Sequence, residues 1–600
     1  MKTIQNIGLG VLLIGMVLFT GIIFLGSYTY KESEIGVYFE KVRGEQSQII
    51  AKGFKQAVHE SLGVNPVKLN NPFVFNQRLQ SIIGRHNEIM KEQFMVTDGI
   101  STLDVKHLLT AVKTPEGIEY NKAILSTVFT GKKQQLMLNN TSWMFSGQRG
   151  YSSIDDFKTD LLSKVNEINR NVGHEYYIGT DGGTLLSLTG VFINSLVKSH
   201  KLLWFFLTFG LVILGTMAYH FPNVKLLGPA GIKNDGIMHA SATSRGWVGL
   251  VVFGYLVTFY IILYFNSQFL VNNIFLVDPI SLALSGHIAS HWFLYGFIYC
   301  TVMSLMAIRM YIKYRNNKYQ ILRTTSVLFF QIVFAFLIPE LLTRFNMPSY
   351  DLKLAFPLDY DFFYAWSIDQ LIEAGAVGMF ILIWGIILTV VLVPLFVYLF
   401  GKRWYCSWVC GCGGLAETLG DPYRQLSNKS LKFWKVERWL VHSVLVFALL
   451  MTVGTLYTYF TGVSSVFGIS TYDLQVWYGF LIGSIFAGVI GTGFYPVMGN
   501  RVWCRMGCPL AAYLGIVQRF KSRFRITTNG AQCISCGNCS TYCEQGIDVR
   551  WYAQRGQNIV RASCVGCGVC SAVCPRGVLK LENGPEESRF KISEMPSIKK

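Results

Sequence analysis

Long apolar runs alternate with short charged segments along most of the chain. A helix needs about 20 predominantly apolar residues to cross the hydrocarbon of a bilayer. Eight such runs lie at about 7–27, 201–220, 247–266, 286–308, 322–342, 374–400, 439–461 and 476–497. This pattern predicts a polytopic α-helical membrane protein with about eight transmembrane helices.

The polar stretches between these runs suggest the domain boundaries. The first run is long and lacks a small-residue cleavage site, which favours a retained anchor at 1–30 over a cleaved signal peptide. A polar insert follows, and we predict an α+β domain: SIDDFKTDLLSKVNEINRNVG has helical spacing, while AILSTVF and EYYIG are typical of strands. The predicted domains after the anchor are the insert at 31–198, a transmembrane bundle at 199–400, a loop at 401–437, two spans at 438–500, a basic linker at 501–530, a ferredoxin-like domain at 531–582 and a tail at 583–600.

Composition agrees with a membrane protein, and the charge distribution predicts its orientation. Hydrophobic residues make up 51% of the 600 residues, and the net charge is +18. Basic residues gather at 308–323, after Gly401 and in the last hundred residues, whereas 343–373 is acidic. Because basic loops stay in the cytoplasm, we predict a bacterial inner-membrane protein with both termini cytoplasmic and residues 31–198 extracytoplasmic. This orientation accounts for the positive charge without a nucleic-acid partner.

Two cysteine runs with the same spacing lie near the end of the chain. CISCGNCSTYC and CVGCGVCSAVC each follow C-x-x-C-x-x-C-x-x-x-C and contain eight of the 14 cysteines. In two-cluster ferredoxins the last cysteine of each run ligates the other cluster. Paired zinc sites and disulfides are the alternatives, but the third and fourth cysteines favour iron. We therefore predict two [4Fe-4S] clusters, the first held by Cys533, Cys536, Cys539 and Cys574 and the second by Cys564, Cys567, Cys570 and Cys543.

A shorter repeat carries two more cysteine pairs. RWYCSWVC (403–410) and RVWCRMGC (501–508) each follow an apolar run and contain C-x-x-x-C. In a helix this spacing places both thiols on one face. Free buried cysteines and thiol exchange are the alternatives to metal binding here. Cys412 is left over, and Cys300 is expected to serve packing. The repeat predicts a further metal or redox site made of Cys406, Cys410, Cys504 and Cys508.

Few ionisable residues interrupt the apolar runs, so those that do are functional candidates. His287 and His291 lie four residues apart, and Glu340 falls at the same predicted end of the next run. A quinol releases protons together with its electrons, and these three residues are candidates to accept them. Interfacial hydrogen bonding, or haem ligation together with His442, are the alternatives.

Over about residues 374–580 the sequence resembles the membrane-bound polyferredoxins, the family of the NapH, NosR and CcoG proteins. The resemblance rests on two apolar runs that end in C-x-x-x-C, followed by two four-cysteine runs. It implies electron transfer between the quinone pool and a respiratory reductase system of the nitrate or nitrous-oxide type. The alternatives are a maturation or metal-reduction factor for a respiratory metalloenzyme, and a redox-sensing membrane protein.

The sequence departs from the family pattern in three places. Family members usually carry C-x-x-x-C-P twice, whereas here only Cys508 precedes proline. Glu544 stands where proline is common after Cys543. The insert also lacks the threonine motif that carries flavin in NosR-like proteins, so covalent FMN is not expected.

Overall fold

The chain folds into two compact units. The structure, a computed structural model, describes residues 2–63, 68–96, 113–114, 117–118, 131–141, 154–227, 243–463, 465–529 and 532–583. One unit consists of Ile22–Ser199 and Ser267–Asn272, and we call it the insert unit. The other consists of Met1–Gly21, His200–Asn266 and Asn273–Lys600. It holds all of the cysteines, and we call it the membrane unit.

The described part of the insert unit is mainly helical. Its helices include α2 (Glu32–Arg43), α3 (Ser47–Leu62), α4 (Pro72–Phe94), α8 (Lys132–Thr141), α9 (Ile154–Tyr176) and α10 (Gly182–Phe192). Its described strands are two antiparallel two-residue pairs, β1 (Ser27–Tyr28) with β4 (Ile193–Asn194) and β2 (Lys113–Thr114) with β3 (Gly117–Ile118).

The structure tests the secondary structure that we predicted for this insert. α9 confirms the helix over SIDDFKTDLLSKVNEINRNVG. The strand predicted at EYYIG is wrong, because its first two residues end α9 and the rest has no regular structure. AILSTVF lies outside the described residues. The predicted α+β class is therefore wrong for the described part, where helices pack on helices.

Nine helices in the described part of the chain are long and apolar enough to cross a membrane. Eight of them overlap the eight predicted runs, with ends that differ by a few residues, which confirms those elements. Their bounds are Lys2–Phe24, Lys201–Pro222, Trp247–Phe265, His291–Lys313, Lys318–Arg344, Gly375–Phe400, Leu431–Thr461 and Thr471–Gly493. The ninth, Ser267–Leu284, was not predicted, and it ends in α14 (Val271–Leu284).

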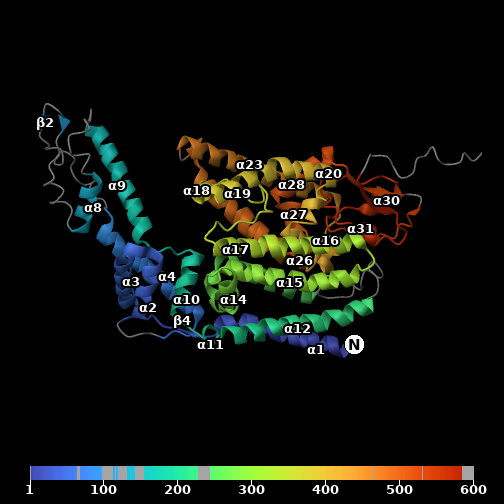
Figure 1. The fold of residues 1–600 in the computed structure, drawn as a ribbon, viewed down its shortest axis with the longest axis horizontal. Helices are drawn as coiled ribbons and strands as arrows, with labels where there is room; N and C mark the ends of the chain where they lie inside the picture. Colours follow the sequence, from blue (N-terminus) through green and yellow to red (C-terminus); the bar gives the residue numbers. More distant parts are fainter. Residues whose placement is uncertain are drawn as a thin grey trace, which may run out of the picture. The chain divides into compact units, whose positions relative to one another are not determined.

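α14 lies at one end of the helical bundle (Figure 1). Near its start, Asn273 donates a hydrogen bond to a carbonyl oxygen close to the end of α1 (Lys2–Gly21). In its middle, Asp278 pairs with Lys201, the first residue of α12 (Lys201–Leu227), at 2.6 Å. Near its end, the carbonyl oxygen of Ala283 accepts from Arg344, the last residue of α17 (Ile338–Arg344). Because both of its ends stay at this end of the bundle, α14 does not cross, and eight of the described helices remain as spans.

Three spans contain π-helical segments. η6 (Phe330–Leu337) follows α16 (Lys318–Phe329), and η7 (Leu388–Leu392) joins α19 (Gly375–Ile387) to α20 (Val393–Phe400). η9 (Gly479–Ile490) follows α24 (Thr471–Tyr478). Such segments widen a helix locally and are frequent at functional sites.

Residues 346–364 fold back among the spans, and we call them the re-entrant segment. The backbone N–H of Phe356 donates to Oγ1 of Thr389, which lies well inside the Gly375–Phe400 span. The indole of Trp384 donates to the carbonyl oxygen of Leu352 at 2.7 Å. Irregular backbone at this depth is tolerated where protein surrounds it or where it lines a cavity. The acidic composition of 343–373 had indicated only a loop outside the membrane.

A ferredoxin-like region closes the described chain. β7 (Phe524–Thr528) pairs antiparallel with β8 (Leu579–Asn583), with Phe524 opposite Asn583 and Thr528 opposite Leu579. Between the strands lie the short helices α29 (Asn538–Thr541), α30 (Val549–Gln554) and α31 (Val569–Ala572). The two strands hold together the ends of the segment that contains both cysteine runs.

Candidate functional site

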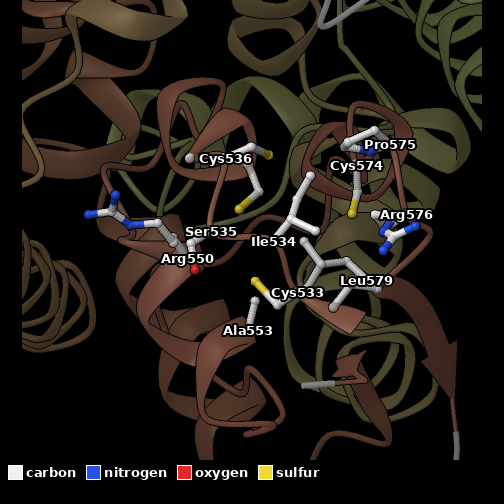
Figure 2. A pocket seen from close by; sticks show the side chains of 13 residues that line it. Cys533, Ile534, Ser535, Cys536, Arg550, Ala553, Cys574, Pro575, Arg576 and Leu579 are labelled. Carbon is white, nitrogen blue, oxygen red and sulfur yellow. The ribbon is translucent and has the colours of Figure 1, made fainter. Parts of the chain in front are cut away.

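Each cysteine run surrounds one cavity and contributes its last cysteine to the other. Cavity 1 has an empty volume of about 360 Å³, and Figure 2 shows thiols of its lining facing a common space. Cavity 2 has an empty volume of about 380 Å³. The structure thus brings together the two quartets that the sequence had predicted. They are Cys533, Cys536, Cys539 and Cys574 around cavity 1, and Cys543, Cys564, Cys567 and Cys570 around cavity 2.

The backbone of both runs turns in the same way. Ser535 and Gly566 occupy equivalent positions and have φ of 58° and 60°. Gly537 and Gly568 follow the second cysteine of each run with φ of 80° and 74°. Left-handed conformations like these curl the chain around a centre and suit glycine, which has no Cβ. A short helix then begins in each run, so the two loops have matching shapes.

The thiols around cavity 2 lie in a buried site that suits a bound iron-sulfur cluster. Burial raises the pKa of Cys564 to about 11 and that of Cys567 to about 12. Free thiols in this place would therefore stay protonated at neutral pH. A bound metal deprotonates its thiol ligands outright, because it supplies the positive charge that the site lacks. The donor set and the burial both fit an iron-sulfur cluster.

The shorter cysteine repeat also folds as a repeat. In each copy a short helix carries the first cysteine, and the backbone N–H of the second cysteine bonds back to it, from Cys410 to Tyr405 and from Cys508 to Trp503. Each second cysteine then caps the next helix, α22 (Gly411–Glu417) or α28 (Pro509–Lys521). The expectation that both cysteines of C-x-x-x-C lie on one continuous helix is therefore wrong, because the helix ends between them.

The four cysteines of the repeat share one buried core, and we call them the four-cysteine site. The backbone N–H of Ala511 donates to Sγ of Cys508 at 3.3 Å, and Nη1 of Arg501 lies 3.8 Å from Sγ of Cys504. Among the described residues, no three His, Cys, Asp or Glu side chains converge closely enough to hold a single metal ion. The site comprises Cys406, Cys410, Cys504 and Cys508.

Cys412 is not spare, although the sequence suggested that it was. It hydrogen-bonds to Cys410, and this bond is the main reason that the pKa of Cys410 falls to about 6 in spite of its burial. Cys410 is thus the thiol of this group that ionises most readily. Its partner is two residues away, across the start of α22, where sequence spacing gave no signal.

The loop of the second cluster is hydrogen-bonded to the membrane spans. Oγ of Ser407 donates to the carbonyl oxygen of Val565 at 2.8 Å, which links the residue after Cys406 to the residue after Cys564. The carbonyl oxygen of Cys567 accepts from a glutamine side chain of α16 at 2.8 Å. The four-cysteine site and cavity 2 are therefore neighbours in one packed core.

Buried charged side chains also connect the second cysteine run to the loops next to the membrane spans. We call these side chains the buried ionic network. Glu544 accepts from Arg424 at 2.6 Å and pairs with Arg501 at 2.9 Å. Burial alone would raise the pKa of Glu544, but these arginines lower it, so Glu544 is charged. This network could not be predicted from the sequence, because its members are scattered along the chain. They are Arg309, Lys313, Arg323, Glu417, Asp421, Arg424, Arg501 and Glu544.

The histidines and the glutamate predicted for proton transfer only partly come together. Ser285 bonds to the backbone N–H of His287 and to the carboxylate of Glu340. His291 packs instead against Trp292, with ring centroids 4.7 Å apart. His442 bonds to a carbonyl oxygen on its own helix.

Comparisons with known proteins agree with this geometry. A family described as a 4Fe-4S binding domain matches 380–432 and 478–527, and a 4Fe-4S dicluster domain matches 525–575. No solved structure matches the chain. The first match covers the spans and loops around the four-cysteine site, and the second covers the two cysteine runs.

Two curated relatives carry related names. YccM of Escherichia coli (strain K12), named as an electron transport protein, is 27% identical over 190 residues, which are 30% of this chain and 49% of YccM. MauN of Methylobacillus flagellatus, named as a methylamine utilization ferredoxin-type protein, is 29% identical over 158 residues, which are 26% of this chain and 53% of MauN. The chain spans about half the length of these relatives. Together with the domain matches and the apolar helices, these relatives identify the chain as an iron-sulfur membrane protein that carries two [4Fe-4S] clusters.

Proposed function

We propose that the chain transfers electrons between the quinone pool of the membrane and a respiratory redox partner, in a reductase system of the nitrate or nitrous-oxide type. One observation carries this proposal. Val565 and Cys567 of the second cysteine run pack in the same buried core as the four-cysteine site. Redox groups within one packed core can exchange electrons without passing through water.

The two clusters have different surroundings, which suits a directional carrier. Cavity 2 is buried against the membrane spans, whereas Cys536 of cavity 1 is exposed. Arg550 and Arg576 also line cavity 1 (Figure 2). An acidic partner would be attracted to this surface. The cluster in cavity 1 is therefore the one that exchanges electrons with the partner, on the cytoplasmic side if the basic loops are inside.

Cys410 favours a second candidate function, in the maturation of a metalloenzyme. A thiol whose pKa is near 6 is ionised at neutral pH and can bind a soft metal. In that case Cys412→Ala, which removes the donor that stabilises the Cys410 thiolate, would block assembly of a partner enzyme while both clusters stay bound. In the respiratory proposal, partner assembly would not depend on Cys412.

Anaerobic purification with iron analysis and EPR tests the proposal. Two cubanes give about eight irons per chain, and a third centre at the four-cysteine site would add to that number. Adding a reduced quinol should produce the EPR signals of reduced clusters. Cys300→Ser is the matched control, since Cys300 belongs to none of the three cysteine groups and bonds to a carbonyl of a neighbouring helix. Zinc in place of iron, or clusters that quinol leaves oxidised, would contradict the proposal.

A further inference from the structure

A larger cavity lies directly beside the four-cysteine site, and we call it the aromatic cavity. Its volume is about 320 Å³, within the range of roughly 300–1,000 Å³ that is usual for small-molecule sites. One wall comes from η6 with Phe330, and the other from η7 and α20 with Leu392 and Phe396. Trp404 and Val409 close the end next to the cysteines. Val409 is covalently bonded to Cys410.

The re-entrant segment supplies the one charge in this lining. Among the described residues that line the aromatic cavity, Lys353 alone is charged. Its side chain is 8% exposed, and Nζ lies 2.6 Å from a carboxylate oxygen of Asp351. The carbonyl oxygen of Lys353 accepts from the hydroxyl of Tyr405, the residue before Cys406. Asp351 thus holds the cation, and the bond from Tyr405 holds the backbone of Lys353 beside the first cysteine pair.

We propose that the aromatic cavity binds the ring of an isoprenoid quinone or quinol, with Lys353 as the hydrogen-bond donor to a ring oxygen. The inference rests on the proposed function and gives it a site. Tryptophan and phenylalanine faces suit a flat ring, and apolar walls suit an isoprenoid tail. A lipid acyl chain would use the apolar walls but would leave Lys353 without a ligand oxygen.

The location also accounts for electrons and protons. Oxidation of one quinol to quinone releases two electrons and two protons, and the two oxidised clusters can take one electron each. Asp351, paired with Lys353, is placed to accept a proton. Tyr350 precedes it in the re-entrant segment and donates to the buried carboxylate of Asp359 at 3.0 Å. Because the Asp351 side chain is 21% exposed, it can accept each of the two protons in turn and release it to water.

Photolabelling tests the site on the full chain with both clusters bound. The probe is an azido-substituted ubiquinone analogue, and mass spectrometry locates the modified peptides. We expect saturable labelling within 326–334 and 384–409. Leu392→Trp fills the cavity and should reduce labelling at least tenfold. Val390→Trp is the matched control, because Val390 is 65% exposed on another face of η7 and should leave labelling unchanged. Lys353→Met should weaken binding by about tenfold or more, since it removes a charged hydrogen-bond donor.

Two results would overturn the site. One is labelling centred on His287 and Glu340, and the other is equal labelling of the two tryptophan variants. Quinol-driven cluster reduction separates this inference from the proposed function. If quinol reduces the clusters of Leu392→Trp as fast as those of the unchanged protein, the proposed function stands and the proposed site is wrong. If the cavity is labelled but quinol reduces no cluster, the site stands and the function is wrong. Iron content and thermal stability confirm that each variant is folded.

Discussion

Replacing Glu544 by glutamine tests whether the buried ionic network holds the ferredoxin-like region against the spans. Glu544 follows Cys543 in the chain, and its partners Arg424 and Arg501 belong to the loops next to the spans. Glutamine keeps the shape of the side chain and one acceptor oxygen but removes the charge. Both arginines would then lose a counter-ion at a place where water does not reach.

The size of the effect follows from the burial and from the remaining partners. Removing one partner of a buried ion pair typically costs about 3–5 kcal/mol. Arg424 keeps Asp421 and Arg501 keeps Glu417, so the lower end applies, about 3 kcal/mol. A factor of ten corresponds to about 1.4 kcal/mol. We therefore expect the ferredoxin-like region to detach transiently roughly 100-fold more often.

Hydrogen exchange followed by mass spectrometry measures this opening. Amides in peptides that cover 561–570 should exchange roughly 100-fold faster in Glu544→Gln, while its iron content stays that of the unchanged protein. Asp369→Asn is the control, since it makes the same chemical change at an exposed carboxylate that accepts from Tyr459. If Glu544→Gln exchanges within threefold of the unchanged protein, the network does not hold the region in place.

Three other changes test the sites individually. Cys543→Ser should remove only the cluster of cavity 2 and Cys574→Ser only that of cavity 1, each with the loss of about four irons; EPR that shows the opposite assignment would refute the exchange of the fourth cysteines. Burial lowers the pKa of Lys429 to about 8, although nearby Cys543 opposes this. As pH rises through about 8, loss of this positive charge should lower the midpoint potential of the cavity 2 cluster, and Lys429→Met should abolish the pH dependence in a redox titration. A Cβ at Gly413 would collide with the carbonyl oxygen of Cys406, so Gly413→Ala should lower the melting temperature, whereas Gly210→Ala, with open space around it, should not.

The elements that sequence predicted best are those with a local signature. Eight spans follow from continuous apolar runs, and both cavities follow from cysteine spacing. The polar residues Asn272, Asn273 and Asp278 interrupt the apolar sequence of α14, so this helix could not be predicted from a continuous apolar run. Because these polar side chains face other parts of the protein rather than lipid, α14 can be helical and largely buried without looking like a span.

Features that depend on distant partners could not be predicted. Arg501 binds Glu417, from which it is separated by 84 positions in the sequence, and Arg424 binds Glu544 across 120 positions. Each of these residues looks like an ordinary charge in a loop until the chain is folded. The re-entrant segment was missed for a similar reason. Its acidic residues are typical of an exposed loop, and only contacts such as that of Phe356 with Thr389 reveal its depth.

The docking of the second cysteine run has a consequence for biogenesis. Cys564 and Cys570 are buried, and the loop that carries them is bonded to Ser407 and to α16. A scaffold protein that delivers iron and sulfide cannot reach these thiols once the region has docked, so this cluster must be loaded while the region is still free. Cys536 stays exposed. Cavity 1 thus keeps one cysteine within reach of a repair protein, although Cys539 in its lining is buried, whereas replacing the cluster in cavity 2 requires the two parts to separate.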